Sequence, residues 1–419
     1  MQQNQDGKMN RRDFTKVSAA AGFGILAGNA FAGKKNVDTL KVGLLGCGGR
    51  GTGATVNMLE GNENVLLVAM ADLYQDRLDN ARDKMKNHEN AAVAQKYAVQ
   101  DDHCFVGLDA YWQILNTDID ILIEGTPPYR RPKHIERAVL CRKHVFMEKP
   151  VAVDPEGIRK IMEASERART LGLSIVAGTQ RRHQQDYIET IKRIQDGKIG
   201  DVLALRCYWC SGLPWARERQ EGWSDLEHRT RNWLNNCWTS GDSIVEQHVH
   251  NLDVCNWVMG THPIRVLAVG GRTWKPPEEK YGDNFDHFAC DFEYENGVHL
   301  LSVCRHWNGC TDRVSEAVVG SKRESNCVDM ARKRENSVNP YVQEHVDLVK
   351  SIRGEGPYLN EGVQVAESTM TAIMGRMAAY TGQMQVWNKA LQTDLGLVPD
   401  DLDFAKEYPC GPVPCPVKL

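Results

Sequence analysis

A glycine-rich turn directly after an apolar run constrains this chain more than any other feature. Residues 40–45, LKVGLL, have the pattern of a buried strand and lead straight into GCGGRG at residues 46–51. Gly46 permits a sharp turn out of the strand, Gly48 permits backbone N–H groups to approach a phosphate, and Gly51 permits close packing of the next helix. A phosphate there would lie at a helix N-terminus, where unpaired N–H donors and the helix dipole favour negative charge. The sequence therefore predicts a strand–turn–helix unit that binds the pyrophosphate of a dinucleotide.

A second strand-like run supports this interpretation. Residues 65–71 are apolar and end in Asp72, roughly 20 residues beyond the turn, where an acidic residue binds the ribose 2′-OH. Because such a carboxylate repels a 2′-phosphate, we expect NAD(H) rather than NADP(H) as the cofactor, although Arg77 leaves NADP(H) open. The alternative role for Asp72 is the N-cap of a helix over residues 74–88.

Strand and helix patterns alternate as far as residue 178. After Asp72 come a strand at 119–123, a helix at 133–141, a strand at 143–147, a helix at 155–170 and a strand at 171–177. This alternation predicts a doubly wound parallel sheet, an α/β Rossmann domain over residues 38–178, whose ligands bind beyond the carboxyl ends of the strands. The residues that we expect to contact the cofactor are Gly46, Gly48, Gly49, Arg50, Gly51, Asp72, Thr126, Pro127, His134, Glu148 and Lys149.

The second half of the chain has a different character. Five strand-like runs follow one another with few helices between them, at residues 202–210, 264–269, 288–294, 298–304 and 314–319. This order predicts an open-faced, mostly antiparallel sheet of the α+β kind, flanked by helices at 341–353 and 362–380. We therefore expect a substrate and oligomerisation domain over residues 179–387 and a C-terminal tail over residues 388–419.

The first residues carry an export signal. Asn10-Arg11-Arg12-Asp13-Phe14 precedes a weakly apolar stretch at 17–26, and Ala30-Phe31-Ala32 has the form of a cleavage site. This pattern predicts a twin-arginine signal peptide over residues 1–32 and a periplasmic mature protein. The alternative is an N-terminal helix of a cytoplasmic protein. The apolar stretch is shorter than the roughly 20 residues that a membrane anchor needs, and no other run predicts a span.

Composition agrees with a globular enzyme. With 42% hydrophobic and 25% charged residues, the chain can build a substantial core. The net charge of −4 argues against a nucleic-acid partner.

Three motifs together resemble the Gfo/Idh/MocA oxidoreductases, which act mainly on sugars, inositols and related polyols. They are the glycine turn, Glu148-Lys149-Pro150 and Glu246-x-x-x-His250-x-x-Asp253, and the resemblance extends to Tyr380-Thr381-Gly382 followed by Val386-Trp387. It implies a Rossmann domain, an open-faced sheet that carries substrate contacts and often an oligomer interface, and a nicotinamide between them. It assigns the family's lysine to Lys149 and its acid and histidine to Glu246 and His250, with an acid one methylene longer than the family's aspartate.

The chemistry of alcohol oxidation asks for these groups independently. A base of near-neutral pKa must remove the hydroxyl proton while hydride leaves, and His250 meets that need. Glu246 lies four residues earlier on an expected helix, on the same face, where its carboxylate can fix the imidazole tautomer. Lys149 would hold the same substrate oxygen and stabilise its alkoxide character. The alternatives are a surface lysine, a packed histidine and a simple salt-bridge partner; His248 lies on a different face.

Substrate contacts follow from position. Gln180, Arg181 and Arg182 come after the sixth strand, and Asp253 shares the helical face of His250. Trp209, Trp233 or Trp238 would stack on a sugar face, although tryptophan is as often part of a core. We predict no metal, because hydride transfer to NAD needs none.

These observations predict an exported, NAD-dependent oxidoreductase of a sugar or glycoside, with a tightly bound cofactor and a homo-oligomeric assembly. One alternative is a glycosidase that oxidises a sugar carbon transiently so that the neighbouring glycosidic bond is eliminated. The other is a non-catalytic sugar-binding protein.

Overall fold

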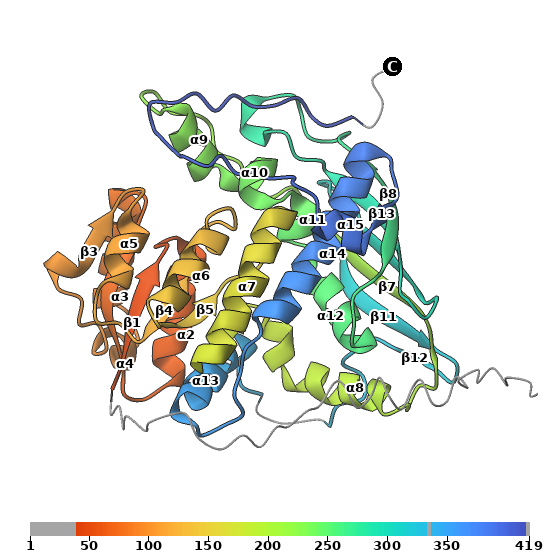
Figure 1. Ribbon diagram of the computed structural model, residues 1–419, viewed down its shortest axis with the longest axis horizontal. Helices are drawn as coiled ribbons and strands as arrows, with labels where there is room; N and C mark the ends of the chain where they lie inside the picture. The colour runs from red at the N-terminus through yellow and green to blue at the C-terminus, as the bar shows by residue number, and fades with distance from the viewer. Residues whose placement is uncertain (1–38, 333–336, 416–419) are drawn as a thin grey trace, which may run out of the picture. The chain divides into compact units, whose positions relative to one another are not determined.

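Six parallel strands form the first sheet, in the spatial order β3-β2-β1-β4-β5-β6 (Figure 1). Their bounds are Leu40–Leu45 (β1), Val65–Asp72 (β2), Cys104–Val106 (β3), Ile121–Glu124 (β4), His144–Met147 (β5) and Ile175–Ala177 (β6). The central strands β1 and β4 are mostly apolar, with Lys41 and Glu124 as their charged residues, because helices cover both faces of the sheet. The doubly wound parallel sheet is therefore confirmed in this computed structural model, which describes residues 39–332 and 337–415.

The helices of the first half begin and end where the local sequence dictates. They are α2 (Gly49–Gly61), α3 (Gln75–Lys86), α4 (Ala91–Ala94), α5 (Ala110–Leu115), α6 (Arg131–Leu140) and α7 (Pro155–Leu171). In α7, the Asp154 side chain accepts a hydrogen bond from the N–H of Gly157, and Gly172 ends the helix at a φ of 68°. Residues 171–174, which we expected in the sixth strand, belong to this helix end and the turn after it.

The second sheet has seven strands in the order β12-β11-β7-β10-β9-β8-β13. They are β7 (Val202–Ser211), β8 (Arg265–Gly271), β9 (His287–Glu293), β10 (His299–His306), β11 (Arg313–Gly320), β12 (Glu324–Ser325) and β13 (Gln385–Val386). Only the β7–β10 pairing is parallel among the strands of this sheet that the structure describes. The mostly antiparallel sheet is confirmed.

Helices lie over one face of the second sheet and leave the other face open. They include α8 (Gln185–Gln195), α12 (Val249–Met259), α14 (Gly362–Thr381) and α15 (Trp387–Leu391). On the open face, β8 exposes Leu267 and Val269 at 58% and 68%, and β10 exposes Leu301 at 43%. The sheet is thus open-faced, as expected.

The last helices of the chain return to the first sheet. Helix α13 (Pro340–Arg353) packs on α2, and α14 packs on α7. Residues 359–361 also run beside β6, where the N–H of Ile175 donates to the carbonyl of Leu359 at 3.0 Å and the N–H of Glu361 donates to the carbonyl of Ile175 at 2.9 Å. Because of these contacts, both hydrophobic cores contain residues from each half of the chain.

Two further predictions concern the signal peptide and membrane-spanning segments. The signal peptide predicted for residues 1–32 lies outside the described residues. Within residues 39–332 and 337–415, no helix is long and apolar enough to cross a membrane.

Candidate active site

The glycine turn has the geometry that a pyrophosphate requires. Gly46 has a φ of +95°, and a Cβ there would lie 2.6 Å from the backbone nitrogen of Thr126. A Cβ on Gly51 would lie 2.0 Å from the carbonyl oxygen of Gly46, so α2 can pack this closely only with glycine. At Gly48 and Gly49, by contrast, a Cβ would meet no atom within 4 Å. The turn thus presents open backbone at the N-terminus of α2, which fits a phosphate group.

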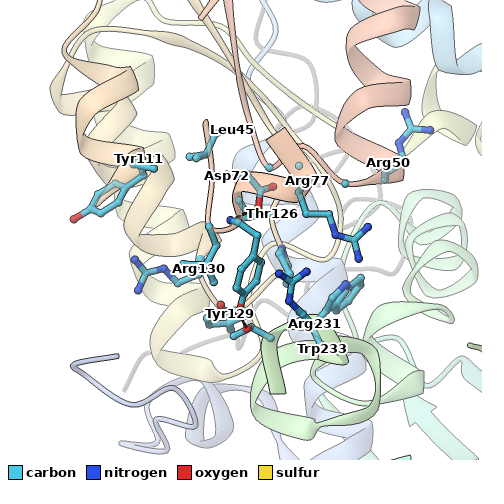
Figure 2. Close-up of a pocket in the computed structure, with 18 of the residues that line it drawn as sticks. Leu45, Arg50, Asp72, Arg77, Tyr111, Thr126, Tyr129, Arg130, Arg231 and Trp233 are labelled. Carbon is cyan, nitrogen blue, oxygen red and sulfur yellow. Dashed lines mark hydrogen bonds between the residues drawn. The ribbon is translucent and has the colours of Figure 1, made fainter. Parts of the chain in front are cut away.

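A cavity of about 380 Å³ lies at the carboxyl ends of β1, β2 and β4 (Figure 2). Of the residues predicted to contact the cofactor, those that line it are Gly46, Gly48, Gly49, Arg50, Asp72, Thr126, Pro127 and His134. Gly51, Glu148 and Lys149 are not part of its wall. The cavity therefore joins the glycine turn to the end of β2, as a dinucleotide site does in a doubly wound sheet.

Asp72 is held by backbone groups beside this cavity. Its two carboxylate oxygens accept hydrogen bonds from the N–H groups of Cys47 at 2.6 Å and Tyr74 at 2.9 Å. Burial raises the pKa of the Asp72 carboxyl above its ordinary value. Each oxygen retains a lone pair that a ribose hydroxyl can use. Helix α3 begins at Gln75, so Asp72 precedes the helix cap by two residues.

A buried carboxylate that sequence reasoning missed organises the middle of the site. Glu124, the last residue of β4, accepts hydrogen bonds from Arg131 at 2.7 Å, from the Thr126 hydroxyl and from His134 at 3.0 Å. Burial lowers the pKa of His134, whose ring also stacks on Tyr111. Glu124 thereby orients the two predicted cofactor contacts Thr126 and His134. The sequence signal that could have identified Glu124 is a charged residue at the end of an otherwise apolar strand.

Arg50 and Glu148 form an ion pair between the glycine turn and the residue before Lys149. The Arg50 Nε lies 2.6 Å from Glu148 Oε1, and the guanidinium stacks over the ring of Tyr341 in α13. Both residues were predicted to contact the cofactor. The structure pairs them with each other at the edge of the cavity, and their contact with the cofactor stays a prediction.

Lys149 follows β5 and reaches across to the second half of the chain. Its Nζ donates to the carbonyl oxygen of Glu246 at 2.6 Å and to Glu246 Oε1 at 3.0 Å. The Lys149 side chain is 12% exposed and that of Glu246 is 9% exposed. A carboxylate and a carbonyl oxygen thus accept hydrogen bonds from the ammonium in a mostly buried position.

The expected single helix carrying Glu246 and His250 is wrong. Helix α11 (Ser243–Glu246) ends at Glu246, and α12 starts at Val249. His248 lies at the break and turns towards the second sheet, where its Nε2 is 2.8 Å from the hydroxyl of Ser302. Because the helix is interrupted, the carbonyl of Glu246 is available to Lys149, a contact that a continuous helix would hinder.

His250 lies in the first turn of α12 beside this pair. Its ring stacks on Trp209 at a centroid distance of 5.9 Å, and it has no hydrogen-bond partner among the described residues. Burial holds the pKa of His250 well below its ordinary value, and the positive charges of Lys149, Arg181 and Arg50 lower it further. The imidazole is therefore neutral at neutral pH, with its nitrogens available to a ligand.

The predicted substrate contacts divide into two groups. Trp209 lies against His250, and Gln180 donates to the hydroxyl of Tyr341 at 3.1 Å. Arg182 and Asp253 instead form a buried bidentate pair, with the closest contact at 2.8 Å.

Arg181 is similarly engaged, because it pairs with the buried carboxylate of Glu316. Trp238 packs on Tyr129 and Tyr408, on the side of the chain's tail. Contact with a sugar stays a prediction for all six residues, Gln180, Arg181, Arg182, Trp209, Trp238 and Asp253. Among residues 39–332 and 337–415, no cluster of His, Cys, Asp and Glu has the arrangement of a metal site.

Comparison with known protein families follows the same division of the chain. Residues 40–175 match the "Oxidoreductase family, NAD-binding Rossmann fold", and residues 187–323 match the "GFO/IDH/MocA C-terminal domain". The chain belongs to the Gfo/Idh/MocA oxidoreductase family. Its cofactor is therefore NAD, in agreement with the glycine turn and Asp72, and the family resemblance noted in the sequence is confirmed.

Several Gfo/Idh/MocA relatives are similar over part of the chain. An inositol 2-dehydrogenase of Klebsiella pneumoniae (strain 342) is 28% identical over 222 residues, 53% of this chain and 55% of that protein. A glycosyl hydrolase family 109 protein of Shewanella baltica (strain OS155 / ATCC BAA-1091) is 26% identical over 250 residues, 54% of this chain and 50% of that protein. The chain thus spans about half the length of the curated relatives that it matches.

A solved structure supports the fold over a larger share of the chain. The scyllo-inositol dehydrogenase of Lactobacillus casei, crystallised with NAD(H) and scyllo-inositol, superposes with a TM-score of 0.64 at 18% identity. The match covers 84% of this chain and 99% of that one. At this level of identity the likeness concerns the fold alone.

Proposed function

We propose that this protein is an NAD-dependent oxidoreductase that converts a CH–OH group of a sugar or glycoside to a carbonyl group. The observation that carries the proposal is the contact of Lys149 with Glu246, because it brings an ammonium from the first half of the chain against the segment that holds His250. The family and its inositol 2-dehydrogenase relative support a polyol substrate.

Each side chain has a distinct task in the proposed reaction. The neutral His250 accepts the hydroxyl proton of the substrate, and Lys149 donates a hydrogen bond to the same oxygen as negative charge develops on it. Bound NAD supplies the hydride acceptor. Glu246 positions the lysine, and its buried Oε2, which has no partner among the described residues, is available to a second substrate hydroxyl.

The nicotinamide itself provides the test. Purified protein is incubated with a panel of sugars, inositols and glycosides while nicotinamide fluorescence is followed, and we expect reduced cofactor to form with at least one polyol. His250→Ala and Lys149→Ala should abolish that signal while cofactor binding is retained. No reduction with any member of the panel, or full activity in both variants, contradicts the proposal.

A second candidate activity rests on the glycosyl hydrolase family 109 relative. Oxidation of a sugar hydroxyl to a ketone by NAD would acidify the neighbouring C–H, so that loss of that proton expels the glycosidic leaving group. Water would then add across the resulting C=C bond and the hydride would return to the ketone, so that the net reaction is hydrolysis. Chromogenic glycosides incubated with the purified protein and no added oxidant distinguish the two activities. Release of the chromophore with no net cofactor reduction favours the glycosidase.

We also propose export by the twin-arginine route, on the basis of Arg11 and Arg12. A nicotinamide enzyme outside the cytoplasm has no free cofactor pool, so the proposal includes a cofactor that stays bound and is reoxidised by a second sugar. Cell fractionation of the wild-type chain and an Arg11→Lys/Arg12→Lys variant tests export. A variant that reaches the periplasm as well as the wild type contradicts this route.

We propose in addition that the open face of the second sheet is a homo-oligomer interface. Leu267 and Leu301 flank Asp291 in one row across β8, β9 and β10, and Val269 lies in the next row. Exposed apolar rows of this kind mark association surfaces. Light scattering of the wild type and a Val269→Glu variant tests this; a wild-type monomer contradicts it.

A further inference from the structure

A segment from the second half of the chain forms one wall of the cofactor cavity. The segment lies between β7 and β8 and includes α9 (Asp225–Arg231) and the short helix η3 (Trp233–Asn235). The wall consists of side chains whose role the family motifs do not assign, namely Trp215, Arg217, Thr230, Arg231 and Trp233. Figure 2 shows Arg231 and Trp233 beside Arg77 on one side of the cavity.

This segment is held by side-chain contacts to the loop that follows β2, through Tyr74, and to the first turn of α3, through Asp76. The hydroxyls of Tyr74 and Thr230 are 2.6 Å apart. Arg231 forms a bidentate ion pair with Asp76, at 2.8 and 3.0 Å, and its guanidinium lies 3.8 Å from the centre of the Tyr74 ring. Both Tyr74 and Asp76 follow Asp72 closely in sequence. These contacts are therefore next to Asp72, the carboxylate that we predict to bind the adenosine ribose.

The wall has the chemistry of a purine site. Arg77 and Arg217 both line the cavity, and neither guanidinium has a hydrogen-bond acceptor among the described residues. Arg217 lies over the ring of Trp215, which meets Trp233 edge to face at 6.1 Å. Burial lowers the pKa of Arg217, as do the charges of Arg77 and Arg231, so these cations are close together. Planar guanidiniums and indole rings stack on a nucleobase, and the guanidiniums also attract the phosphates of a nucleotide.

The C-terminal tail holds α9 in place from outside. The N–H of Tyr408 donates to Asp225 at 2.9 Å, and Arg229 donates to the carbonyl of Tyr408 at 3.1 Å. Phe404 meets the ring of Tyr74 edge to face at 6.3 Å. In Figure 1 the dark-blue tail passes along α9 and α10 (Cys237–Ser240). The segment is thus fixed both to the loop after β2 and to the end of the chain.

We propose that residues 215–233 are the second half of the adenosine site and act as a clasp that keeps the dinucleotide bound through successive turnovers. The adenine lies between Arg77 on α3 and the Arg217, Trp215 and Trp233 wall. It leaves only when the Tyr74–Thr230 and Asp76–Arg231 contacts open. The inference deepens the proposed function, because it rests on NAD as the ligand.

The first test measures cofactor release from the purified full chain. Protein loaded with NADH is mixed with excess NAD⁺, and the loss of bound-nicotinamide fluorescence gives the release rate. Arg231→Ala removes an ion pair and a cation–π contact, so release should accelerate by about tenfold or more. Tyr74→Phe removes only one hydroxyl and is therefore a milder variant, which should still fold if Arg231→Ala does not. It should accelerate release by a smaller factor. Arg169→Ala removes an exposed ion pair on α7, outside both the segment and the cavity wall, and should release at the wild-type rate.

The second test measures the adenosine half alone. ADP-ribose titrated into nucleotide-free protein should bind at least about tenfold more weakly to Arg217→Ala and Trp233→Ala than to wild type, because stacking on each base contributes about this much. Wild-type release and wild-type ADP-ribose affinity in these variants would overturn the clasp. Neither measurement needs a sugar. If the variants release cofactor and bind ADP-ribose as expected but the protein oxidises no sugar, only the proposed function is refuted. Sugar oxidation by a protein that exchanges NADH freely refutes only the clasp.

Discussion

Replacing Lys149 by methionine should slow turnover by a factor of about 10² to 10³. An ammonium has three N–H donors, and the structure directs two hydrogen bonds at Glu246, at 2.6 and 3.0 Å. One donor remains for the substrate oxygen, and the loss of one such donor costs about 10² to 10³ in kcat. Methionine keeps the length and apolar packing of this largely buried side chain, so the cofactor site should persist.

The same substitution should move the pH dependence. The charge of Lys149 helps to hold the pKa of His250 below its ordinary value. Without that charge the pKa of His250 rises, and the acid limb of the kcat/KM profile should shift to higher pH because the base must be neutral. This shift follows from the lost charge, whereas the loss of rate reports the lost hydrogen bond to the substrate oxygen.

Single-turnover reduction of bound cofactor is the assay, with the polyol that the wild type oxidises fastest. ADP-ribose binding checks that the nucleotide site is intact, and Lys198→Met, at an exposed lysine, is the matched control. A Lys149→Met protein with the wild-type rate and the wild-type pH profile would refute the assignment of Lys149 to the reacting oxygen.

Three further substitutions test the site and its support. Gly51→Ala forces a Cβ to 2.0 Å from a backbone oxygen and should abolish ADP-ribose binding, whereas Gly53→Ala meets no atom within 4 Å and should bind normally; equal affinities contradict this. Glu124→Gln leaves the buried Arg131 without its carboxylate and should destabilise the fold by about 3 kcal/mol, measured by thermal unfolding; an unchanged midpoint contradicts this. Burial lowers the pKa of His144 from 6.5 to about 4, and its ring accepts a backbone N–H. Since the unfolded chain binds the extra proton in that interval, stability should fall by at most about 3 kcal/mol as pH drops from 6.5 to 4, and His144→Asn should remove this part of the slope in denaturation at several pH values.

The parts of the fold that depend on local pattern were predictable. The glycine turn predicted β1, α2 and the phosphate end of the cavity, because Gly46 and Gly51 leave no space for a side chain. The antiparallel second sheet followed from strand runs without intervening helices. The predicted start of the sixth strand was wrong, because helix α7 continues to its glycine cap at Gly172.

The contacts between distant segments were not predictable. Nothing in the spacing from Glu246 to His250 shows that the helix breaks between them. His248 at the break contacts Ser302 in β10, a residue that is distant in sequence. Arg182 and Asp253 looked like ligand contacts, but their sequence separation conceals that they pair with each other. The cavity wall from residues 215–233 was visible only as a polar segment rich in tryptophan and arginine.

The return of residues 359–361 to β6 has a consequence for dissecting this protein. A fragment that stops after β6 would leave that strand with unpaired N–H and C=O groups, and such a bare edge is a template for aggregation. The same fragment would lose Leu348 and Val349 of α13 from the core under β1. We therefore expect that the nucleotide-binding half does not fold as an isolated fragment. A truncated protein that contains this half has to retain the stretch from α13 to the start of α14.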